Sequence, residues 1–493
     1  MDNEDCISPF SIYNNEYHRG ISKELKVRIK EEIRKAGYFW LPSNPERKIP
    51  GTLSITDGGN IELEVVGLFD ESIEGLNRAF AGKNELDRII GNIEKHGLVT
   101  LDDCFYKNLA FPTGGISRST IHVNKAFIGY AYDEKENVMF NTFEFSVEGI
   151  DEWVGISGIL VKHMLENRTA SITYAPPEEI SMYLNNGMTL LITFSWTLPG
   201  CPTQKEAKLT QKIYFKLKSE RETTFTDFIS TSYKITTFIG FAIDRTVCID
   251  SITATSDKIQ REISNGESIT VPISIYYPSL PYTKDVPKID KYRMLFTYGQ
   301  IRDNAEGIIN NWIDAYDTID PALNLYFSVK TGAHKYIDGK FLALAQGLET
   351  YHRRTSTQMS MDEKAYQKLS AMLIDQCPEK HKQWLSGRLQ HGNELSLVKR
   401  IKSIIEPFED ILGTSREQKN LIRSIVDTRN YLTHYDRTNK SMVAIRGELW
   451  VLCQKMEAIF QLHLLQVLGF SEPEVKSIFE NSSELQQKLN QNR

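Results

Sequence analysis

The sequence predicts an α+β protein in which a β-rich N-terminal domain is followed by an all-α helical bundle. Three observations support this fold class. Apolar and polar residues alternate in several segments between residues 52 and 277, which indicates strands with one buried face. After Pro287 the apolar residues recur at helical spacing instead. The 493 residues are enough for roughly two to four domains.

Residues 1–36 are expected to form an N-terminal helical segment. Residues 22–36 are rich in charge and stop before Gly37, which is typical of a short helix closed by glycine. The first residues show neither the basic nor the apolar stretch of a signal peptide. The most apolar runs are too short or too polar to span a bilayer, so we expect a cytoplasmic protein without membrane contact.

Residues 37–285 are expected to form the β-rich domain. The clearest signal is a hairpin, because the alternating runs 52–56 and 61–65 flank the turn residues Asp57-Gly58-Gly59-Asn60. Other strand-like runs are bounded by Gly, Pro and Asn. They are 119–132, 138–147, 188–198, 212–218 and 268–277. Helices are expected to interrupt this region near 71–97 and from Thr224 into the 240s.

Residues 286–493 are expected to form a bundle of roughly five or six helices. Apolar residues follow a helical period in the segments 301–316, 340–352, 362–374, 394–412, 415–433 and 441–468. The polar residues 471–493 are expected to fray or to add a short final helix.

Charge is distributed unevenly between the two parts. Residues 286–493 hold 28 Lys and Arg against 25 Asp and Glu, a net charge of +3. The totals of 58 and 64 leave 30 against 39, a net charge of −9, for residues 1–285. If the protein binds a polyanion, the C-terminal part is therefore the more favourable of the two for binding. Neither part is as basic as a typical nucleic-acid-binding domain.

The cysteine pattern argues against a zinc site or a redox dithiol. The six cysteines lie far apart and form no CxxC pair. Scattered single cysteines fit a reducing cytosol. We expect neither a metal nor a cofactor.

The segment that carries chemistry is 427–436, at the end of the expected helix 415–433. It contains Arg429, the polar residue Asn430 and, after three more residues, His434. Of the ten histidines, only His434 follows an arginine by five to seven positions. The spacing Arg-x4-His arises by chance about once in two chains of this length, but the asparagine and the helical context make the whole pattern much rarer.

These residue types suit cleavage of RNA by its own ribose 2′-OH. A histidine titrates near neutral pH and can take the proton from that hydroxyl. An arginine offers fixed donors to the extra negative charge that forms on the phosphorus. The products are a 2′,3′-cyclic phosphate and a 5′-OH, and the reaction needs no metal.

The spacing raises a question of geometry. Arg429 and His434 are about 140° apart around an ideal helix, whereas Asn430 and His434 share a face. The arginine can wrap towards the same cleft, the helix can end or bend between the two residues, or two copies can form one composite site in a dimer. The alternative is a solvated helix end where Arg429 pairs with Asp427 or Asp436.

A second feature lies on the expected helix from Lys340. Glu349 and Arg353 are four residues apart on one helix face, so they can brace Arg429 and shape the cleft. The alternative is a surface salt bridge of small energetic value. His352 is expected on the helix surface.

A third feature is the basic stretch 379–402. One of two interpretations is contact with phosphates through Lys399, Arg400 and Lys402. The alternative is a solvated polar connection.

These segments resemble the ApeA family of bacterial defence proteins. The residues 37–42, 49–53 and the hairpin 57–65 are similar to the ApeA N-terminal domain. The residues 348–354 and 428–434 resemble the ApeA-like HEPN domain.

The resemblance implies a metal-independent endoribonuclease that acts against bacteriophage by abortive infection. It implies that His434 is the catalytic histidine, that Arg429 stabilises the phosphate and that Asn430 is the polar motif residue. Glu349 and Arg353 match the supporting pair on the earlier helix. HEPN nucleases generally act as dimers, so a homodimer or larger assembly is implied, with RNA as substrate and a phage-encoded protein as trigger.

Two matters stay open at this point. The acidic β-rich domain is either a sensor that restrains a toxic nuclease or a scaffold and oligomerisation element. For the helical domain, the first alternative to a ribonuclease is a non-catalytic HEPN module that binds nucleotide or RNA and signals to a partner. The second alternative is an interaction protein in which the motif arose by chance.

Overall fold

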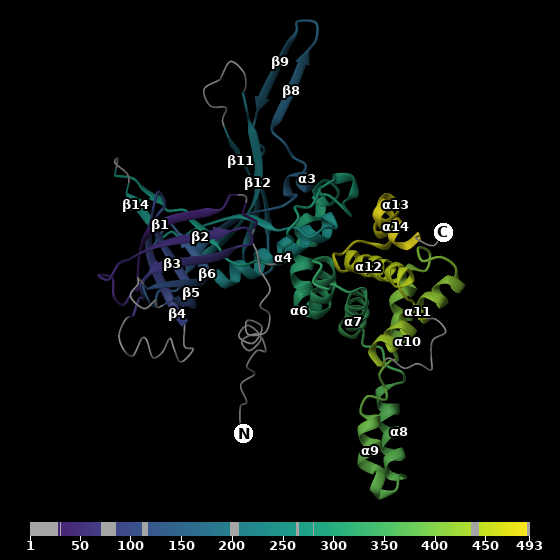
Figure 1. Cartoon of the computed structure of the whole chain (residues 1–493). Helices are drawn as coiled ribbons and strands as arrows, with labels where there is room; N and C mark the ends of the chain where they lie inside the picture. The colour runs from purple at the N-terminus through teal and green to yellow at the C-terminus, as the bar shows by residue number, and fades with distance from the viewer. Residues whose placement is uncertain are drawn as a thin grey trace. The chain divides into compact units, whose positions relative to one another are not determined.

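The computed structural model describes residues 28–29, 31–70, 85–110, 117–197, 207–262, 266–279, 281–434 and 443–490. The chain divides into two compact units, Met1–Gly240 with Thr246–Lys288, and Phe241–Arg245 with Ile289–Arg493. Strands dominate the first unit and helices the second (Figure 1). The predicted fold class is therefore confirmed.

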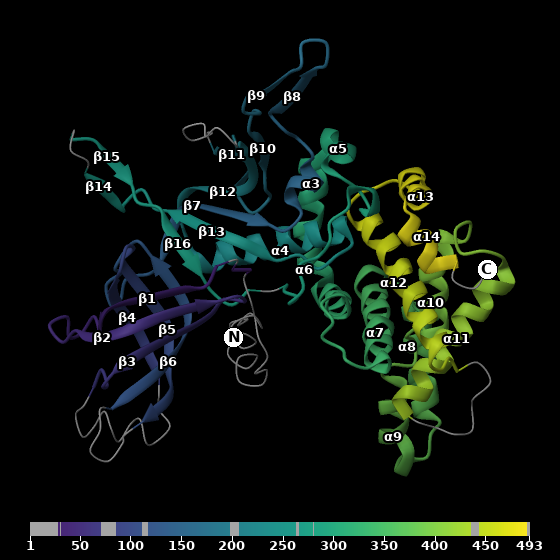
Figure 2. The ribbon, with the colours of Figure 1, turned by 45° about the horizontal axis from the view of Figure 1, so that its top comes forward.

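Among the described residues of the first unit, six antiparallel strands close into a barrel (Figure 2). The pairing runs β6–β3–β2–β1–β4–β5 and returns from β5 to β6, so each strand is paired on both sides. The bounds are Ile33–Trp40 for β1, Ile49–Thr56 for β2, Asn60–Val66 for β3, Glu85–Ile93 for β4, Gly97–Ala110 for β5 and Arg118–Ile128 for β6.

The barrel core follows from the alternation seen in the sequence. Leu53 and Ile55 of β2 face inward and pair with Leu63 and Ile61 of β3, and all four side chains are fully buried. Each such burial stabilises the fold by roughly 1.5–3 kcal/mol. The turn between the two strands places Gly59 at a φ of 65°, a conformation that glycine adopts without strain. The predicted hairpin is therefore present.

The sheet continues beyond β6 as β16–β13–β7–β12–β11–β10, and helix α4 (Phe225–Ile243) packs against it. Phe228 of α4 stacks on Phe143 of β7 with ring centroids 5.5 Å apart. The remaining elements of this unit include the ribbons β8–β9 and β14–β15. The bounds are Met139–Val147 for β7, Ile150–Val154 for α3, Ile159–Met164 for β8, Thr169–Tyr174 for β9, Ile180–Tyr183 for β10, Thr189–Thr197 for β11, Thr210–Thr224 for β12, Ile249–Thr255 for β13, Gln260–Glu262 for β14, Ser268–Thr270 for β15 and Ile273–Tyr276 for β16.

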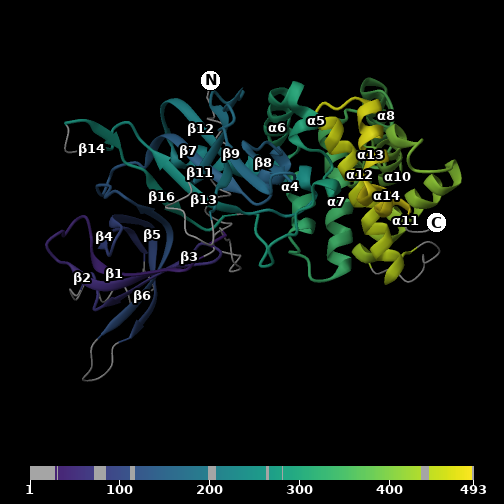
Figure 3. The same cartoon turned by 90° about the horizontal axis from the view of Figure 1, so that it is seen from above.

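The second unit is a helical bundle (Figure 3). Within it, α7 contacts α6, α10, α11 and α12. Its helices are α5 (Tyr298–Ile301), α6 (Ala305–Lys330), α7 (Ile337–Thr355), α8 (Glu363–Asp375), α9 (Glu379–Leu389), α10 (Leu397–Ile405), α11 (Ser415–His434), α12 (Gly447–Val467), α13 (Glu472–Asn481) and α14 (Ser483–Asn490). The central position of α7 matters because it carries Glu349 and Arg353.

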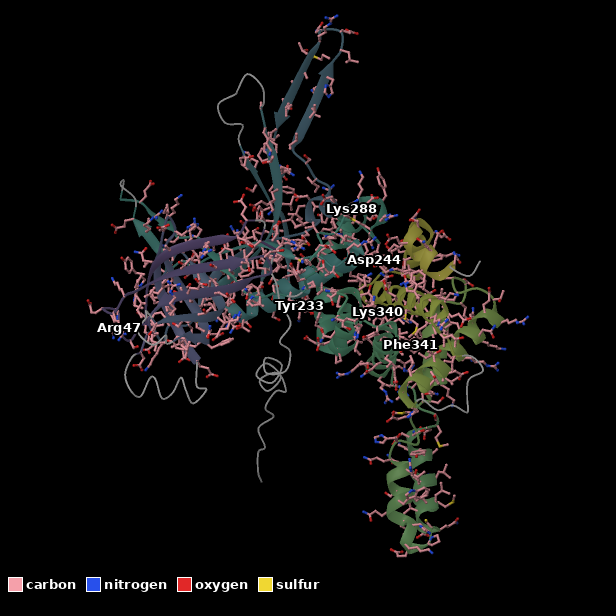
Figure 4. The ribbon with its side chains drawn as sticks, viewed as in Figure 1. Arg47, Tyr233, Asp244, Lys288, Lys340 and Phe341 are labelled. Atoms are coloured by element: carbon pink, nitrogen blue, oxygen red, sulfur yellow. The ribbon has the colours of Figure 1, made fainter. Side chains whose placement is uncertain are left out.

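A buried ion cluster joins several helices of this unit. Asp244, which follows α4 and is marked in Figure 4, accepts from Lys330 of α6 at 2.7 Å and from Lys488 of α14 at 2.8 Å. Lys488 also reaches Glu457 of α12 at 2.7 Å. Burial acts to raise the pKa of the Asp244 carboxyl, but the two ammonium groups outweigh burial and hold that pKa below its usual range.

Several sequence-based expectations need correction. Residues 33–36, expected at the end of a helix, begin β1, and Ile33 pairs with Ile55 of β2. Residues 85–93, also expected as helix, form β4. In both segments charged residues favour helix locally, but pairing with neighbouring strands overrides that preference. Residues 1–27 and 71–84 lie outside the described residues.

Two further differences concern the helical unit. The segment 379–389, for which a polar connection was one interpretation, forms helix α9. The C-terminal residues form α13 and α14, in place of one frayed or short helix. A capping box in which Ser471 and Glu474 bond each other's backbone N–H groups explains why α13 begins where it does.

Candidate functional site

The motif lies on the last turns of α11, a helix that the sequence defines well. At its start, Thr414 and Glu417 form a capping box, with the Thr414 N–H donating to the Glu417 carboxylate at 2.7 Å. Ile425, Val426 and Thr428 are its buried residues. The helix continues through His434, so it does not end between the motif arginine and the motif histidine.

The two polar groups at the end of α11 are open to solvent. His434 is its last residue and is exposed, and Asn430, four residues earlier, is also exposed. The side chain of Arg429 is 34% exposed. Thr433 donates its hydroxyl to the Arg429 carbonyl at 2.7 Å, so the Thr433 side chain is bound to the backbone of its own helix. A ligand in solution can therefore reach the imidazole of His434.

Arg429 is held from a different helix. Its Nη2 lies 3.5 Å from Oε2 of Glu349 on α7, and the Glu349 side chain is 18% exposed. Among the described residues, Glu349 supplies the carboxylate that lies within ion-pair distance of Arg429. Asp436, one of the partners considered from the sequence, lies outside the described residues. The structure therefore brings Glu349 and Arg429 together although they are 80 positions apart.

Glu349 also binds Arg353 one turn later on α7. Oε1 of Glu349 accepts from Arg353 Nη2 at 3.1 Å and from Nε at 3.3 Å. The pair is thus more than an isolated surface salt bridge, because the same carboxylate faces the motif arginine with its other oxygen.

A second carboxylate, Glu394, continues this chain of charges. It accepts from Nη1 of Arg353, from Nη2 of Arg400 at 3.2 Å and from Nδ1 of His391 at 2.9 Å. The hydrogen bond from Arg353 is the main cause that lowers the pKa of the Glu394 carboxyl. The sequence did not point to Glu394, which lies in the turn before α10.

Arg400 is buried, which does not fit its predicted contact with RNA. Its side chain is only 6% exposed, and its guanidinium donates to the Leu395 carbonyl at 3.1 Å and to Nδ1 of His352 at 3.4 Å. The periodic pattern could have shown this, because Arg400 follows Leu397 by three positions and precedes Ile404 by four, on the apolar face of α10. Lys399 and Lys402 are exposed on the same helix.

His352 is buried rather than at the helix surface. It is 4% exposed and lies four positions after Leu348, on the buried face of α7. Its Nδ1 accepts from Arg400, so the ring proton of the neutral imidazole is on Nε2. Burial, followed by repulsion from Arg400 and Arg353, lowers the pKa of His352.

Within the described ranges, no cluster of three or more His, Cys, Asp and Glu side chains is placed to hold a metal ion. No helix in those ranges combines the length and apolar character needed to cross a bilayer.

Comparison with family models identifies both parts of the chain. The model of the ApeA N-terminal domain 1 matches residues 34–312, more than half of the 493 residues. The chain belongs to the ApeA family. The model of the Apea-like HEPN domain matches residues 342–474, which include Glu349, Arg353 and the motif from Arg429 to His434. Comparison of this ApeA chain with curated proteins gives no match.

The second match supports a HEPN-type role in a nuclease or defence system for this ApeA chain. The match to the N-terminal domain extends into α6, beyond the first compact unit.

Proposed function

We propose that this ApeA protein is a metal-independent HEPN endoribonuclease that acts in anti-phage defence by abortive infection. The observation that carries the proposal is the placement of Arg429, oriented by Glu349 from α7, on the same final turns of α11 as an exposed His434. One residue binds a phosphate and the other moves protons near neutral pH.

In the proposed reaction His434 takes the proton from a ribose 2′-OH. The oxygen attacks the adjacent phosphorus, and Arg429 donates to the phosphate oxygens that gain negative charge. The bond from phosphorus to the 5′ oxygen breaks, and a protonated histidine returns a proton to that oxygen. The products are a 2′,3′-cyclic phosphate and a 5′-OH end. Asn430 shares a face with His434 and contributes a polar contact to the RNA.

In a homodimer, Arg429 of one copy and His434 of the other can lie on the same site. Because α11 is helical through His434, that residue and Arg429 project about 140° apart on one copy. Glu349 further draws Arg429 towards α7. Two copies whose α11 ends face each other would place the partner's histidine opposite Arg429 and complete a composite site.

The β-rich unit is proposed as the sensor that keeps the nuclease silent until a phage-encoded protein appears. A toxic ribonuclease must have a state in which it is inactive, and the equilibrium between states can be shifted by a ligand that binds one of them better. Its observed support is the separate core of this unit, which folds around its own barrel.

The test is cleavage of total cellular RNA in excess EDTA by the purified chain, alone and with lysate from infected cells, beside His434→Ala. His381→Ala is the matched control, because His381 is an exposed histidine of the same unit on α9. We expect the parent and the control to leave 2′,3′-cyclic phosphate ends and His434→Ala to leave RNA intact. Equal cleavage by all three proteins would refute the assignment of the site.

The alternative function, a non-catalytic HEPN module that binds nucleotide or RNA, gives a different pattern. It predicts no cleavage by any of these proteins, even with lysate from infected cells. It also predicts RNA binding that is weakened when His434 or Arg429 is replaced.

A further inference from the structure

The Glu349 carboxylate serves two arginines with different oxygens. Arg353 donates twice to Oε1, at 3.1 and 3.3 Å, whereas Arg429 meets Oε2 with one donor at 3.5 Å. The second contact is at the long limit for a hydrogen bond. Because a guanidinium carries five N–H donors, one long contact orients Arg429 and leaves its other donors for a phosphate.

Arg353 also binds a second carboxylate, that of Glu394. Its Nη1 donates to Oε2 of Glu394, and that oxygen also accepts from Arg400 at 3.2 Å. The Arg400 guanidinium is buried and fixed by the Leu395 carbonyl and by His352. Glu394 therefore connects the half-exposed Arg353 to a group that is anchored in the interior.

The base of the α8–α9 hairpin fixes the backbone beside Glu394. Asn393 is buried, its side-chain oxygen accepts from the Met361 N–H at 3.0 Å, and its carbonyl accepts from the Ser360 N–H at 2.8 Å. The Ser360 hydroxyl donates to the Glu394 carbonyl at 3.2 Å. A carboxylate on a backbone held at three points is suited to setting the position of another side chain.

On the basis of the proposed function, we propose that Glu394 and Arg400 are positioning residues for Arg429. Arg400 fixes Glu394, Glu394 holds Arg353, and Arg353 keeps one oxygen of Glu349 engaged. Glu349 then orients Arg429 through its other oxygen and cannot form a two-oxygen pair with it. Such a bidentate pair would occupy the parallel donors that a phosphate uses.

The informative substitutions are Glu394→Gln and Glu394→Asp. The first removes the charge that holds Arg353 with little change in shape. The second keeps the negative charge but withdraws the shared oxygen Oε2 from both Arg353 and Arg400. Each is expected to lower kcat about 10- to 100-fold, because a misplacement of about 1 Å costs that much. KM is expected to stay near the parent value, since the other RNA contacts remain.

A double-mutant cycle separates positioning from general damage. If Glu394 acts through Arg353, then Arg353→Gln and the double variant Arg353→Gln/Glu394→Gln should cleave at the same rate. Glu409→Gln is the matched control, because Glu409 is an exposed glutamate of the same unit outside this cluster. It should retain the parental kcat, and thermal unfolding by circular dichroism should show that each variant is folded.

The experiment uses the full chain and a defined RNA in EDTA, together with crystal structures of the parent and Glu394→Asp. We expect reduced kcat and a two-oxygen Glu349–Arg429 pair in the variant. A parental kcat in folded Glu394→Asp, or losses that multiply in the double variant, would overturn the positioning role. If the parent cuts no RNA even with lysate from infected cells, the proposed function fails, and the crystal structures alone decide: an unchanged Arg429 in Glu394→Asp overturns this inference.

Discussion

Arg400 and His352 meet inside the helical unit, with Nη1 of the arginine 3.4 Å from Nδ1 of the histidine. The guanidinium always carries its proton, so this nitrogen of His352 has to accept. Nε2 of His352 is buried and has no hydrogen-bond partner among the described residues. A second proton on the ring would therefore face a cation, and the contact requires a neutral His352.

A neighbouring histidine predicts loss of stability in acid. His463 on α12 is buried and donates from Nε2 to the Ile404 carbonyl at 2.8 Å, and burial lowers the pKa of His463 from 6.5 to about 4. The unfolded chain then binds more protons than the folded chain below pH 6.5. The contribution of His463 to the free energy of unfolding is therefore fully present above pH 6.5. It is lost as the pH drops towards 4, which lowers that free energy by about 3 kcal/mol.

The measurement is urea unfolding followed by circular dichroism at a series of pH values. His463→Gln keeps an N–H donor but does not titrate, so its stability should fall less between pH 6.5 and 4 than that of the parent. His381→Gln, at an exposed position, should leave the slope of the parent unchanged. The same slope in His463→Gln and the parent would show that His463 is not held neutral.

The buried ion cluster predicts a large cost for Asp244→Asn. The substitution leaves the ammonium groups of Lys330 and Lys488 with Glu457 as the remaining buried carboxylate. Removing one partner of a buried ion pair costs roughly 3–5 kcal/mol, because the other charge stays without compensation.

This cost is measured as a shift in the urea midpoint of the helical signal. Asp303→Asn serves as the control at an exposed position and should change stability by less than about 0.5 kcal/mol. An unchanged midpoint in Asp244→Asn would mean that the cluster contributes no net stability.

Arg429→Lys tests whether the fork of the guanidinium matters or only its charge. Lysine keeps the positive charge but loses the parallel donors that match a phosphate. We expect kcat to fall about 100-fold, as is typical when a transition-state donor is lost. Arg423→Lys, at an exposed position on the same helix, should cleave as the parent does. Parental cleavage by Arg429→Lys would remove the need for a bidentate contact.

The elements that the sequence predicts well are those whose signals are local. The hairpin from Ile49 to Val66 has its turn glycines beside its alternating strands, and α11 has its capping box and its apolar period within one segment. The strands β1 and β4 were missed because their charged residues favour helix, and only pairing with β2 and β5 makes them strands.

In the candidate site, too, the sequence predicts the residues of one local segment but not the contacts between distant segments. The motif from Arg429 to His434 is readable because its residues lie on one helix. The contact between Glu349 and Arg429 spans 80 positions and that between Arg353 and Glu394 spans 41, so both depend on helix packing that no local pattern encodes. Arg400 could have been assigned to the interior from the apolar period of α10.

The exposed lysines of α10 predict how RNA binding depends on salt. Lys399 and Lys402 are three positions apart on one helix and are exposed, so both can reach the phosphates of one strand. Each phosphate contact contributes about 0.7 to the slope of log affinity against log salt for a single strand.

Replacing both lysines with glutamine should therefore raise KM, leave kcat near the parent value and lower the salt slope by about 1.4. The matched control is Lys364→Gln/Lys368→Gln, which removes the same charge from exposed positions of α8. KM is measured between 50 and 200 mM salt, a range over which phosphate contacts dominate affinity. Because the two double variants have the same net charge, an equal rise of KM in both would assign the effect to the overall charge of the unit and not to contacts at Lys399 and Lys402.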